Sequence, residues 1–299
     1  MGCAQPLIAY RSKEIGPSGK RGITFNRNAS FSGISFEVPC GQCIGCRLEH
    51  SRQWAMRCMH EKQMHANNVF VTLTYDDKNL PFGGTLVRKD PQLFLKRLRF
   101  EYGKGIRFYG CGEYGELSRR PHYHFILFNY AAADKKFYKR TKSGENLFTS
   151  PSLERLWPFG FNVVGDVSFK SCAYVARYVT GKIKGDNAEE HYSTVTTDGE
   201  IVNLLPEFSM MSRRPGIGSD WFKKFGAHVY EWDSVIMNGK EVRPPRFYDT
   251  RFEVVDSDRL AVVKSKRRRA AVLNKADNTT ARRIVKEQVS RLNLLKREF

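Results

Sequence analysis

Two apolar segments joined by a short turn set the strongest constraint on the fold of this chain. Residues 106–115 (IRFYGCGEYG) and 121–129 (PHYHFILFN) are rich in the aromatic and branched residues that favour strands, and only residues 116–120 separate them. Strands with so short a connection pair antiparallel, because a parallel crossover needs a dozen or more residues. Further strands are predicted at residues 68–77, before the pair, and at 159–169, after it.

Three helices are predicted around these strands. Residues 47–66 contain no Gly or Pro, and their apolar positions recur at steps of three and four. A second helix opens with Asp90 as N-cap and Pro91 at the first helical position, and it closes at Gly103. A third runs over residues 171–184. The resulting order predicts an α+β fold with a central antiparallel β-sheet and packed helices.

Composition along the chain predicts four segments. Residues 130–148 are polar and read as an insertion, and residues 209–226 read as a basic loop punctuated by glycine. Loops and short strands are expected before residue 47. The expected segments are a cysteine-containing N-terminal segment with its helix (1–66), the sheet-and-helix core (67–185), a basic extension packed on that core (186–260) and a basic helical tail (261–299).

Charge and aromatic content favour nucleic acid as a partner. The formal net charge is +19, and 13% of the residues are aromatic rings that can stack on bases. The last 39 residues carry twelve Lys or Arg against three Asp or Glu, which is about half of the excess. Candidates for phosphate contacts in this tail are Lys266, Arg267, Arg268 and Arg269.

Membrane insertion and secretion are not expected. The sequence has no uninterrupted apolar run long enough to span a bilayer, and its N-terminus lacks a cationic segment followed by a long apolar one. The seven cysteines are odd in number, unlike those of a secreted disulfide framework. A reducing, cytoplasmic compartment is therefore expected.

Two histidines lie on one face of the strand at 121–129. His122 and His124 project from the same side because side chains alternate along a strand. They form either a structural pair or a metal site. Glu113, nine residues before His122, comes level with them if the two strands pair across the turn; Glu116 is the alternative but falls in the turn itself. Two imidazoles and a carboxylate suit Mg²⁺ or Mn²⁺ when phosphate oxygens complete the coordination shell.

Two tyrosines and a lysine follow one stripe of the third helix. Tyr174, Tyr178 and Lys182 are spaced four residues apart, and Arg177 lies alongside. Tyrosines at this spacing are often packing groups. A phenol attacks phosphorus poorly unless a metal ion or nearby cations assist, and the histidine strand and the basic residues could supply both.

Three cysteines form a dense array at the start of the first helix. Cys40, Cys43 and Cys46 have the spacing C-x₂-C-x₂-C, which suits a structural Zn²⁺ site, three ligands of an iron–sulfur cluster, or free thiols in a buried turn. Zinc would require a fourth ligand. The candidates are His50, Cys58 and His60, and no spacing decides among them.

Several of these segments resemble one family. FVTLTY (70–75), PHYHFILF (121–128) and YVARYVTGK (174–182) are similar to the three motifs of the HUH (His-hydrophobic-His) endonucleases. VPCGQCIGCRLEHSRQWA (38–55) and SRRPGIG (212–218) resemble segments of the rolling-circle replication initiators of microviruses, of the gokushovirus type.

The resemblance implies a chemistry for the residues singled out above. His122, His124 and Glu113 would hold a divalent cation against a phosphodiester, and Tyr174 or Tyr178 would attack it. The products would be a 5′-phosphotyrosine link and a free 3′ hydroxyl, and the second tyrosine would permit a later cleavage and rejoining. The family commonly has Lys where this chain has Arg177, so Lys182 or water would have to donate the proton to the leaving oxygen.

The same resemblance implies the partners and the setting. Single-stranded DNA of a phage origin would be the substrate, host helicase and replication proteins the partners, and the cytoplasm of a bacterial host the compartment. Arg213 and Arg214 in the SRRPGIG segment are further candidates for DNA contacts. Two alternatives remain: a two-tyrosine HUH transposase, and a non-catalytic single-strand-binding protein with a zinc site.

Overall fold

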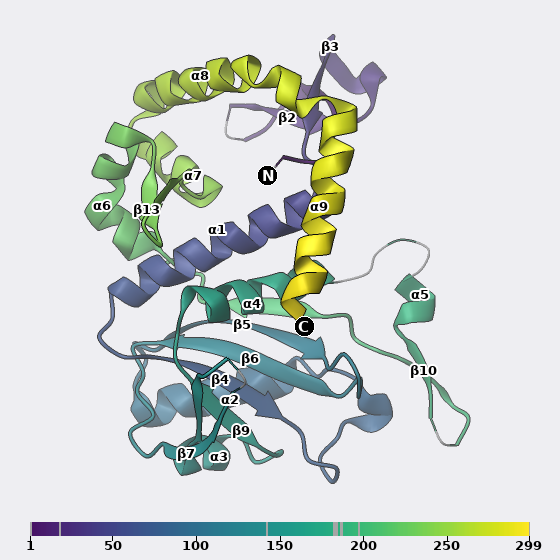
Figure 1. Ribbon diagram of the computed structural model, residues 1–299, viewed down its shortest axis with the longest axis vertical. Helices are drawn as coiled ribbons and strands as arrows, with labels where there is room; N and C mark the ends of the chain where they lie inside the picture. Colours follow the sequence, from purple (N-terminus) through teal and green to yellow (C-terminus); the bar gives the residue numbers. More distant parts are fainter. Residues whose placement is uncertain are drawn as a thin grey trace. The chain divides into compact units, whose positions relative to one another are not determined.

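The chain forms two compact units in its computed structural model (Figure 1). The first unit comprises residues 1–50 and 264–299, and the second comprises residues 51–263. The four segment boundaries expected from the sequence stay predictions. The structure describes residues 2–17, 19–141, 143–181, 185, 188–196 and 198–298, without the side chains of residues 178–181 and 294–298.

An antiparallel sheet forms the centre of the second unit. In the described part of the chain it has seven strands in the order β12-β5-β6-β4-β9-β8-β7, and each neighbouring pair is antiparallel. The strands are β4 (Asn68–Thr74), β5 (Arg107–Tyr114), β6 (Pro121–Phe128), β7 (Lys136–Arg140), β8 (Asn146–Thr149), β9 (Asn162–Gly165) and β12 (Phe208–Met211). The predicted α+β class with a central antiparallel sheet is confirmed.

Helices cover both faces of this sheet. One face packs against α2 (Lys89–Tyr102) and α3 (Pro151–Leu156) through a core that includes Phe94, Phe125 and Trp157. The other packs against α4 (Phe169–Gly181) and the part of α1 (Ile44–Gln63) that belongs to this unit. Along β6 the odd-numbered residues from Tyr123 to Leu127 enter the first core, whereas Ile126 and Phe128 enter the second. The alternation therefore directs His122 and His124 toward the face that carries α4.

Three helix starts differ from the sequence predictions. Helix α1 begins at Ile44, before residue 47, and α4 begins at Phe169, before residue 171. Helix α2 begins at Lys89 with Arg88 at its N-cap position. Asp90 is therefore not the N-cap. Its carboxylate instead accepts a 2.6 Å hydrogen bond from the hydroxyl of Tyr75, a tertiary contact that local spacing does not reveal.

The prediction of a loop at residues 209–226 is wrong for most of its length. Strand β12 ends at Met211, and α6 (Ser219–Trp232) begins directly after the SRRPGIG turn. Gly218 ends the turn with a φ of 81°, a conformation that glycine adopts without strain. The apolar face of α6 joins a third core with α7 (Arg246–Val255) and the first turns of α8 (Ser257–Leu273).

Short elements complete the second unit. Strands β7 and β8 lie within the polar segment predicted as an insertion and form a hairpin at one edge of the large sheet. The others are α5 (Ala188–His191), β10 (Ser193–Val195), β11 (Ile201–Asn203), β13 (Val235–Met237) and β14 (Lys240–Val242). No helix in the described ranges is long and apolar enough to cross a membrane.

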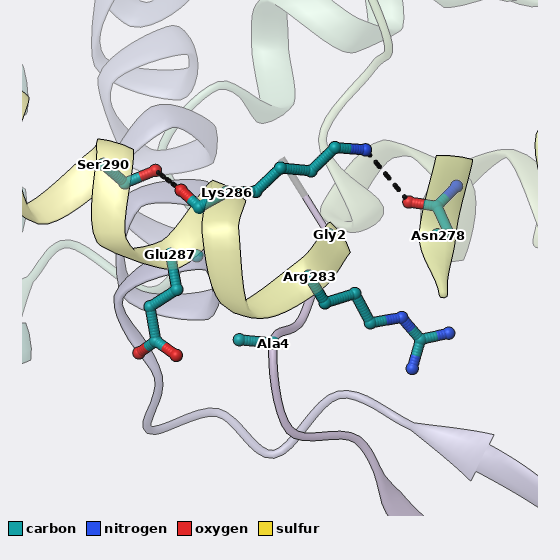
Figure 2. A pocket seen from close by; sticks show the side chains of 8 residues that line it. Gly2, Ala4, Asn278, Arg283, Lys286, Glu287 and Ser290 are labelled. Atoms are coloured by element: carbon teal, nitrogen blue, oxygen red, sulfur yellow. Dashed lines mark hydrogen bonds between the residues drawn. The ribbon is translucent and has the colours of Figure 1, made fainter. Parts of the chain in front are cut away.

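The first unit has few buried side chains. Its sheet has the order β2-β1-β3, formed by β1 (Leu7–Ile15), β2 (Arg21–Thr24) and β3 (Ser30–Val38). Helix α9 (Thr280–Glu298) belongs to the same unit and lines a small pocket with the N-terminal segment (Figure 2). Among the described residues of this unit, the buried hydrophobic side chains are Ala4, Ala9 and Cys43.

Candidate active site

A carboxylate and two imidazoles meet on the neighbouring strands β5 and β6, close to the turn that joins them. Oε1 of Glu113 lies 2.8 Å from Nε2 of His122 and 2.9 Å from Nε2 of His124. The ligand atoms of the three residues all lie within 4.8 Å of one another, so one cation could contact all of them.

Strand pairing positions these three residues. In the antiparallel register between β5 and β6, Glu113 is directly opposite His122, and Cys111 is opposite His124. The sequence prediction that Glu113 comes level with the histidines is therefore met by the geometry. Glu116, the alternative, is exposed in the turn between the two strands.

The second ring nitrogen of each histidine is also held. Nδ1 of His122 lies 3.1 Å from the carbonyl oxygen of Arg120, and Nδ1 of His124 lies 2.8 Å from Oγ1 of Thr72. A carbonyl oxygen only accepts hydrogen bonds, so Nδ1 of His122 must carry a proton. In the neutral ring this tautomer presents the Nε2 lone pair to a metal ion, as metal-ligating histidines usually do.

Burial and the nearby negative charge shift the pKa of each imidazole in opposite directions. Burial lowers the pKa of His122, but the hydrogen bond and negative charge of Glu113 outweigh it, so that pKa lies above its usual value. For His124, which is more deeply buried, desolvation dominates and the pKa lies below its usual value. In the absence of a metal ion, His122 is therefore the imidazole that takes up an extra proton first.

One tyrosine hydroxyl reaches this cluster. The hydroxyl of Tyr174 lies 3.4 Å from Oε1 of Glu113 and 3.5 Å from Nε2 of His124. Its ring packs edge-on against His124 and Phe70, with centroids 5.1 Å and 6.4 Å away. Val175, the next residue along α4, is fully buried in the core beneath the helix and fixes the orientation of this turn.

The other members of the predicted stripe are described only in part. The backbone of Tyr178 lies in α4 one turn after Tyr174, but its side chain is outside the described residues. Lys182 lies outside them altogether. The side chain of Arg177 is half-buried on the same helix.

The donor set fits a divalent cation. It offers two imidazole nitrogens and a carboxylate oxygen, all from neighbouring strands and largely buried. Mixed nitrogen and oxygen donors with positions left for substrate oxygens suit Mn²⁺ and Mg²⁺. The shifted pKa values of the two imidazoles, next to a buried carboxylate and a phenol hydroxyl, are also typical of a functional site.

Comparison with known proteins identifies the family. Residues 68–183 match the family model of the replication-associated protein ORF2/G2P. This range includes α4 and every strand of the large sheet except β12. The replication-associated protein VP4 of Bdellovibrio phage phiMH2K is 34% identical over 223 residues, which cover 72% of this chain and 67% of the relative. The chain belongs to the family of phage replication-associated proteins. The resemblance to initiators of the gokushovirus type is thereby confirmed.

Two further relatives agree with this assignment. The replication-associated protein ORF2 of Spiroplasma virus 4 is 32% identical over 80% of this chain and 75% of the relative. The replication-associated protein ORF4 of Chlamydia phage 1 is 27% identical over 72% of this chain and 53% of the relative. No solved structure gives a significant match.

The basic residues predicted to contact DNA are mostly exposed. Arg213 and Arg214 are exposed in the turn between β12 and α6. On α8, Lys266, Arg268 and Arg269 are exposed and Arg267 is half-buried. Their side chains are therefore accessible for phosphate contacts, which stay a prediction.

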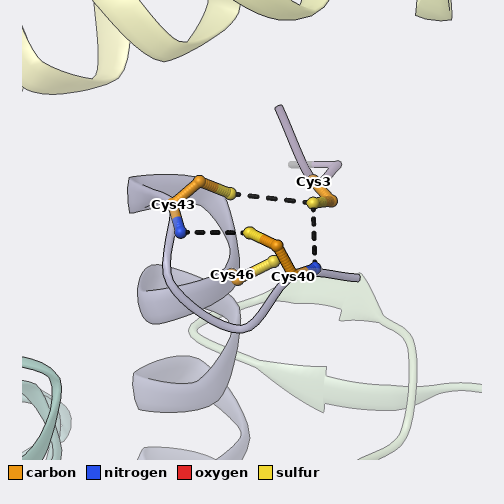
Figure 3. A group of neighbouring side chains, drawn as sticks. All are labelled: Cys3, Cys40, Cys43 and Cys46. Atoms are coloured by element: carbon orange, nitrogen blue, oxygen red, sulfur yellow. Dashed lines mark hydrogen bonds between the residues drawn. The ribbon is translucent and has the colours of Figure 1, made fainter. Parts of the chain in front are cut away.

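The cysteine array gains a member that sequence reasoning missed. Cys3, from the segment before β1, joins Cys40, Cys43 and Cys46, and the four sulfurs lie within 4.8 Å of one another (Figure 3). Of the predicted fourth ligands, none belongs to this cluster. His60 stacks on Trp221, and the fully buried thiol of Cys58 is in contact with Cys172. A cysteine 37 residues before the array carries no local spacing signal, which is why it was missed.

Proposed function

We propose that this chain initiates rolling-circle replication of a phage genome by nicking single-stranded DNA through a tyrosine. The observation that carries the proposal is the position of the Tyr174 hydroxyl, within 3.5 Å of both a glutamate and a histidine of the candidate metal site. Membership of the replication-associated family favours this role over a transposase.

The reaction exchanges one phosphate ester bond for another, so it needs no reactant besides the protein and the DNA. The oxygen of Tyr174 attacks the phosphorus of a phosphodiester and loses its proton, and the bond from phosphorus to the 3′ oxygen breaks. The departing 3′ oxygen takes up a proton. The products are a 5′-phosphotyrosine link and a 3′ hydroxyl that can prime synthesis, and reversal of the same step rejoins the strand.

The residues of the site have separate tasks. Glu113, His122 and His124 would hold Mg²⁺ or Mn²⁺, and the bound ion would polarise the phosphate and counter the charge that develops on it. Thr72 and the carbonyl of Arg120 orient the imidazoles. Glu113 and His124 lie close enough to the Tyr174 hydroxyl to accept its proton. Arg177, on the same helix, would favour the phenolate, and Lys182 is the candidate proton donor.

Membership of the family supports a proposed setting for this reaction. The substrate is the single-stranded phage origin, contacted by Arg213, Arg214 and the basic residues of α8, and the reaction takes place in the cytoplasm of the bacterial host. Host helicase and replication proteins would extend the free 3′ end.

A covalent adduct is the decisive test. Origin DNA labelled at its 3′ end is incubated with the protein and Mn²⁺, then separated under denaturing conditions; the label should remain on the protein, because the 5′ phosphate of the downstream fragment is the linked end. Tyr174→Phe and Tyr178→Phe should each retain an adduct, and the double variant should form none. Phe keeps the ring packing and removes the attacking oxygen.

The matched control is Tyr138→Phe, an exposed tyrosine on β7, which should leave the adduct unchanged. An adduct that persists in the Tyr174/Tyr178 double variant would refute the assignment. Binding of DNA without any adduct from the unmodified protein would favour the non-catalytic single-strand-binding alternative.

A further inference from the structure

We infer that Cys3, Cys40, Cys43 and Cys46 bind one structural zinc ion that holds the first unit together. This inference is independent of the proposed nicking reaction, because all four cysteines lie in the first unit and Glu113, His122 and His124 lie in the second.

The spacing of the sulfurs matches a single tetrahedral ion. With zinc–sulfur bonds of about 2.3 Å, two thiolates on a tetrahedral zinc lie about 3.8 Å apart. The sulfurs of Cys3 and Cys43 are 3.8 Å apart, and the four sulfurs lie within 4.8 Å of one another. In a [4Fe–4S] cluster each cysteine binds a different iron atom, and in a [2Fe–2S] cluster the four cysteines are divided between two irons. Either cluster spreads the four sulfurs further apart than a single ion does.

The backbone around the cluster is arranged to stabilise thiolates. The amide of Cys40 donates to the sulfur of Cys3 at 3.3 Å, and the amide of Ala4 donates to the sulfur of Cys43 at 3.4 Å. The sulfur of Cys40 accepts from the amides of Gln42 and Cys43 at 3.4 Å and 3.3 Å. Donors aimed at sulfur favour its charged form, which is the form that binds a metal.

Two glycines give the cluster its close backbone geometry. Gly41 has a φ of 74°, which turns the chain between Cys40 and Cys43. A Cβ at Gly45 would lie 2.4 Å from the carbonyl oxygen of Gly2, so only glycine lets the start of α1 approach the N-terminal segment that carries Cys3.

The first unit needs such a link because its own core is very small. Its sheet leaves large apolar side chains in solvent, including Ile23 at 52%, Phe31 at 60% and Ile34 at 72% exposure. Small structures without an adequate apolar core are usually stabilised by a metal or by disulfides. None of the cysteines is in a disulfide, and a zinc ion at this cluster would close the loop that contains β1, β2 and β3.

The same ion would fix the surface on which α9 packs. The pocket in Figure 2 is lined by Gly2, Ala4 and Gly45 from the cysteine segments and by residues of α9, and Arg283 of α9 pairs with Glu37 of β3 at 3.1 Å. Release of the metal should therefore loosen the three-stranded sheet and α9 together.

Metal content tests the inference directly. The full-length His122→Ala/His124→Ala variant, purified under reducing conditions, removes the other candidate metal site as a source of bound zinc. Elemental analysis should find one zinc per chain. Adding Cys3→Ser or Cys46→Ser should reduce it to trace levels, whereas Cys58→Ala, on the same helix as Cys46 but outside the cluster, should retain it.

Cobalt exchange keeps the test valid if the serine variants fail to fold. Co²⁺ bound in the otherwise unmodified chain should show the thiolate-to-cobalt charge transfer and intense d–d bands of a tetrahedral thiolate site. Chelation should then increase hydrogen exchange in β1–β3 and α9 while β4, β5 and β6 stay protected. Folded protein without metal, iron in place of zinc, or a disulfide between cluster cysteines would each overturn the inference.

Discussion

The Glu113 carboxylate is shared between the two imidazoles of the candidate metal site, so its charge matters more than its shape. Glu113→Gln keeps the size of the side chain and removes the negative charge. We expect loss of cleavage with DNA affinity almost unchanged, because binding depends mainly on phosphate contacts from basic residues elsewhere. Cleavage assays and fluorescence anisotropy on the same protein would check it. Cleavage at the unmodified rate would exclude Glu113 as a ligand.

Thr72 is expected to tune metal affinity without touching the metal. Thr72→Val removes the hydroxyl that holds Nδ1 of His124, and loss of such a partner typically weakens metal binding by about 10–100-fold. The Mn²⁺ concentration for half-maximal cleavage should rise accordingly, and the rate at saturating Mn²⁺ should largely recover. Thr74→Val is the control, because that hydroxyl donates to the carbonyl of Phe161 instead. Equal metal dependence of the two variants would contradict this role.

His60 is expected to make folding sensitive to mild acid. Burial lowers its pKa in the folded protein to about 4, from about 6.5 in an unfolded chain. Between these two pKa values the unfolded state binds more protons than the folded state. The free energy that neutral His60 contributes to stability is therefore fully present above pH 6.5 and is lost as the pH falls toward 4. The loss approaches about 3 kcal/mol.

The comparison that isolates this effect is His60→Phe, which keeps a ring against Trp221 but cannot ionise. It should be less stable at pH 7, because the hydroxyl of Tyr248 loses its partner at 2.8 Å, yet its unfolding free energy should fall less between pH 7 and pH 4.5. His228→Gln, on an exposed histidine, should retain the full dependence. If the unfolding free energy of the unmodified protein and of both variants fell equally with pH, the prediction would be refuted.

The positions of site residues were predictable where the regular alternation of side chains along a strand determines them. Alternation along β6 and the short turn to β5 were enough to bring His122, His124 and Glu113 together. Thr72 and Cys3 were not singled out, because their partners lie 52 and 37 residues away along the chain and neither spacing is periodic. Contacts of this kind depend on strand order and chain closure, which no window of sequence contains.

At the scale of elements, the close approach of β5 to β6 depends on Gly110. A Cβ there would lie 2.4 Å from the ring of Phe125 and 2.6 Å from the carbonyl oxygen of His124, so the strands would have to separate. Gly110→Ala should destabilise the protein by about 1–3 kcal/mol and reduce cleavage, because Glu113 would move away from His122. Urea unfolding and cleavage assays would measure both effects.

The control for this change is Gly165→Ala on β9. The added methyl group would make only ordinary contacts there, at 3.5 Å from Leu147 and 3.8 Å from Phe70. Stability and cleavage should stay near those of the unmodified protein. Similar losses in both variants would mean that strand glycines matter for reasons other than the spacing of β5 and β6.

Elements were predicted well where apolar periodicity is strong and poorly where turn residues interrupt it. The strands from β4 to β6 and helices α1, α2 and α4 follow the predicted order. Helix α6 was missed because the glycines of the SRRPGIG turn and the charges around it masked the apolar face that enters the third core. The polar segment at 130–148 contains an edge hairpin. Its strand β7 is exposed along its whole length, and its two aromatic residues are adjacent, so its sequence lacks the alternation that predicts a strand.

At the scale of the whole molecule, the charge on α8 is expected to set the salt dependence of DNA binding. Replacing Lys266, Arg268 and Arg269 with Gln removes three exposed positive charges without shortening the chain. If each contacts a phosphate, the slope of log affinity against log salt for single-stranded DNA should fall by about 2, at about 0.7 per contact. Anisotropy titrations at several salt concentrations would measure it, and cleavage of saturating substrate should persist. An unchanged slope would assign the charge to another partner.

The first unit is built from both ends of the chain, and this has a consequence for protein synthesis. A ribosome produces residues 1–50 first, but the rest of that unit, residues 264–299, emerges only after the whole second unit has been made. The large sheet and its helices can therefore fold while the N-terminal strands still lack their partner helix. Translation that stops before residue 264 would leave the second unit complete and the first unit without α9, and quality-control proteases would have an exposed N-terminal segment by which to recognise it.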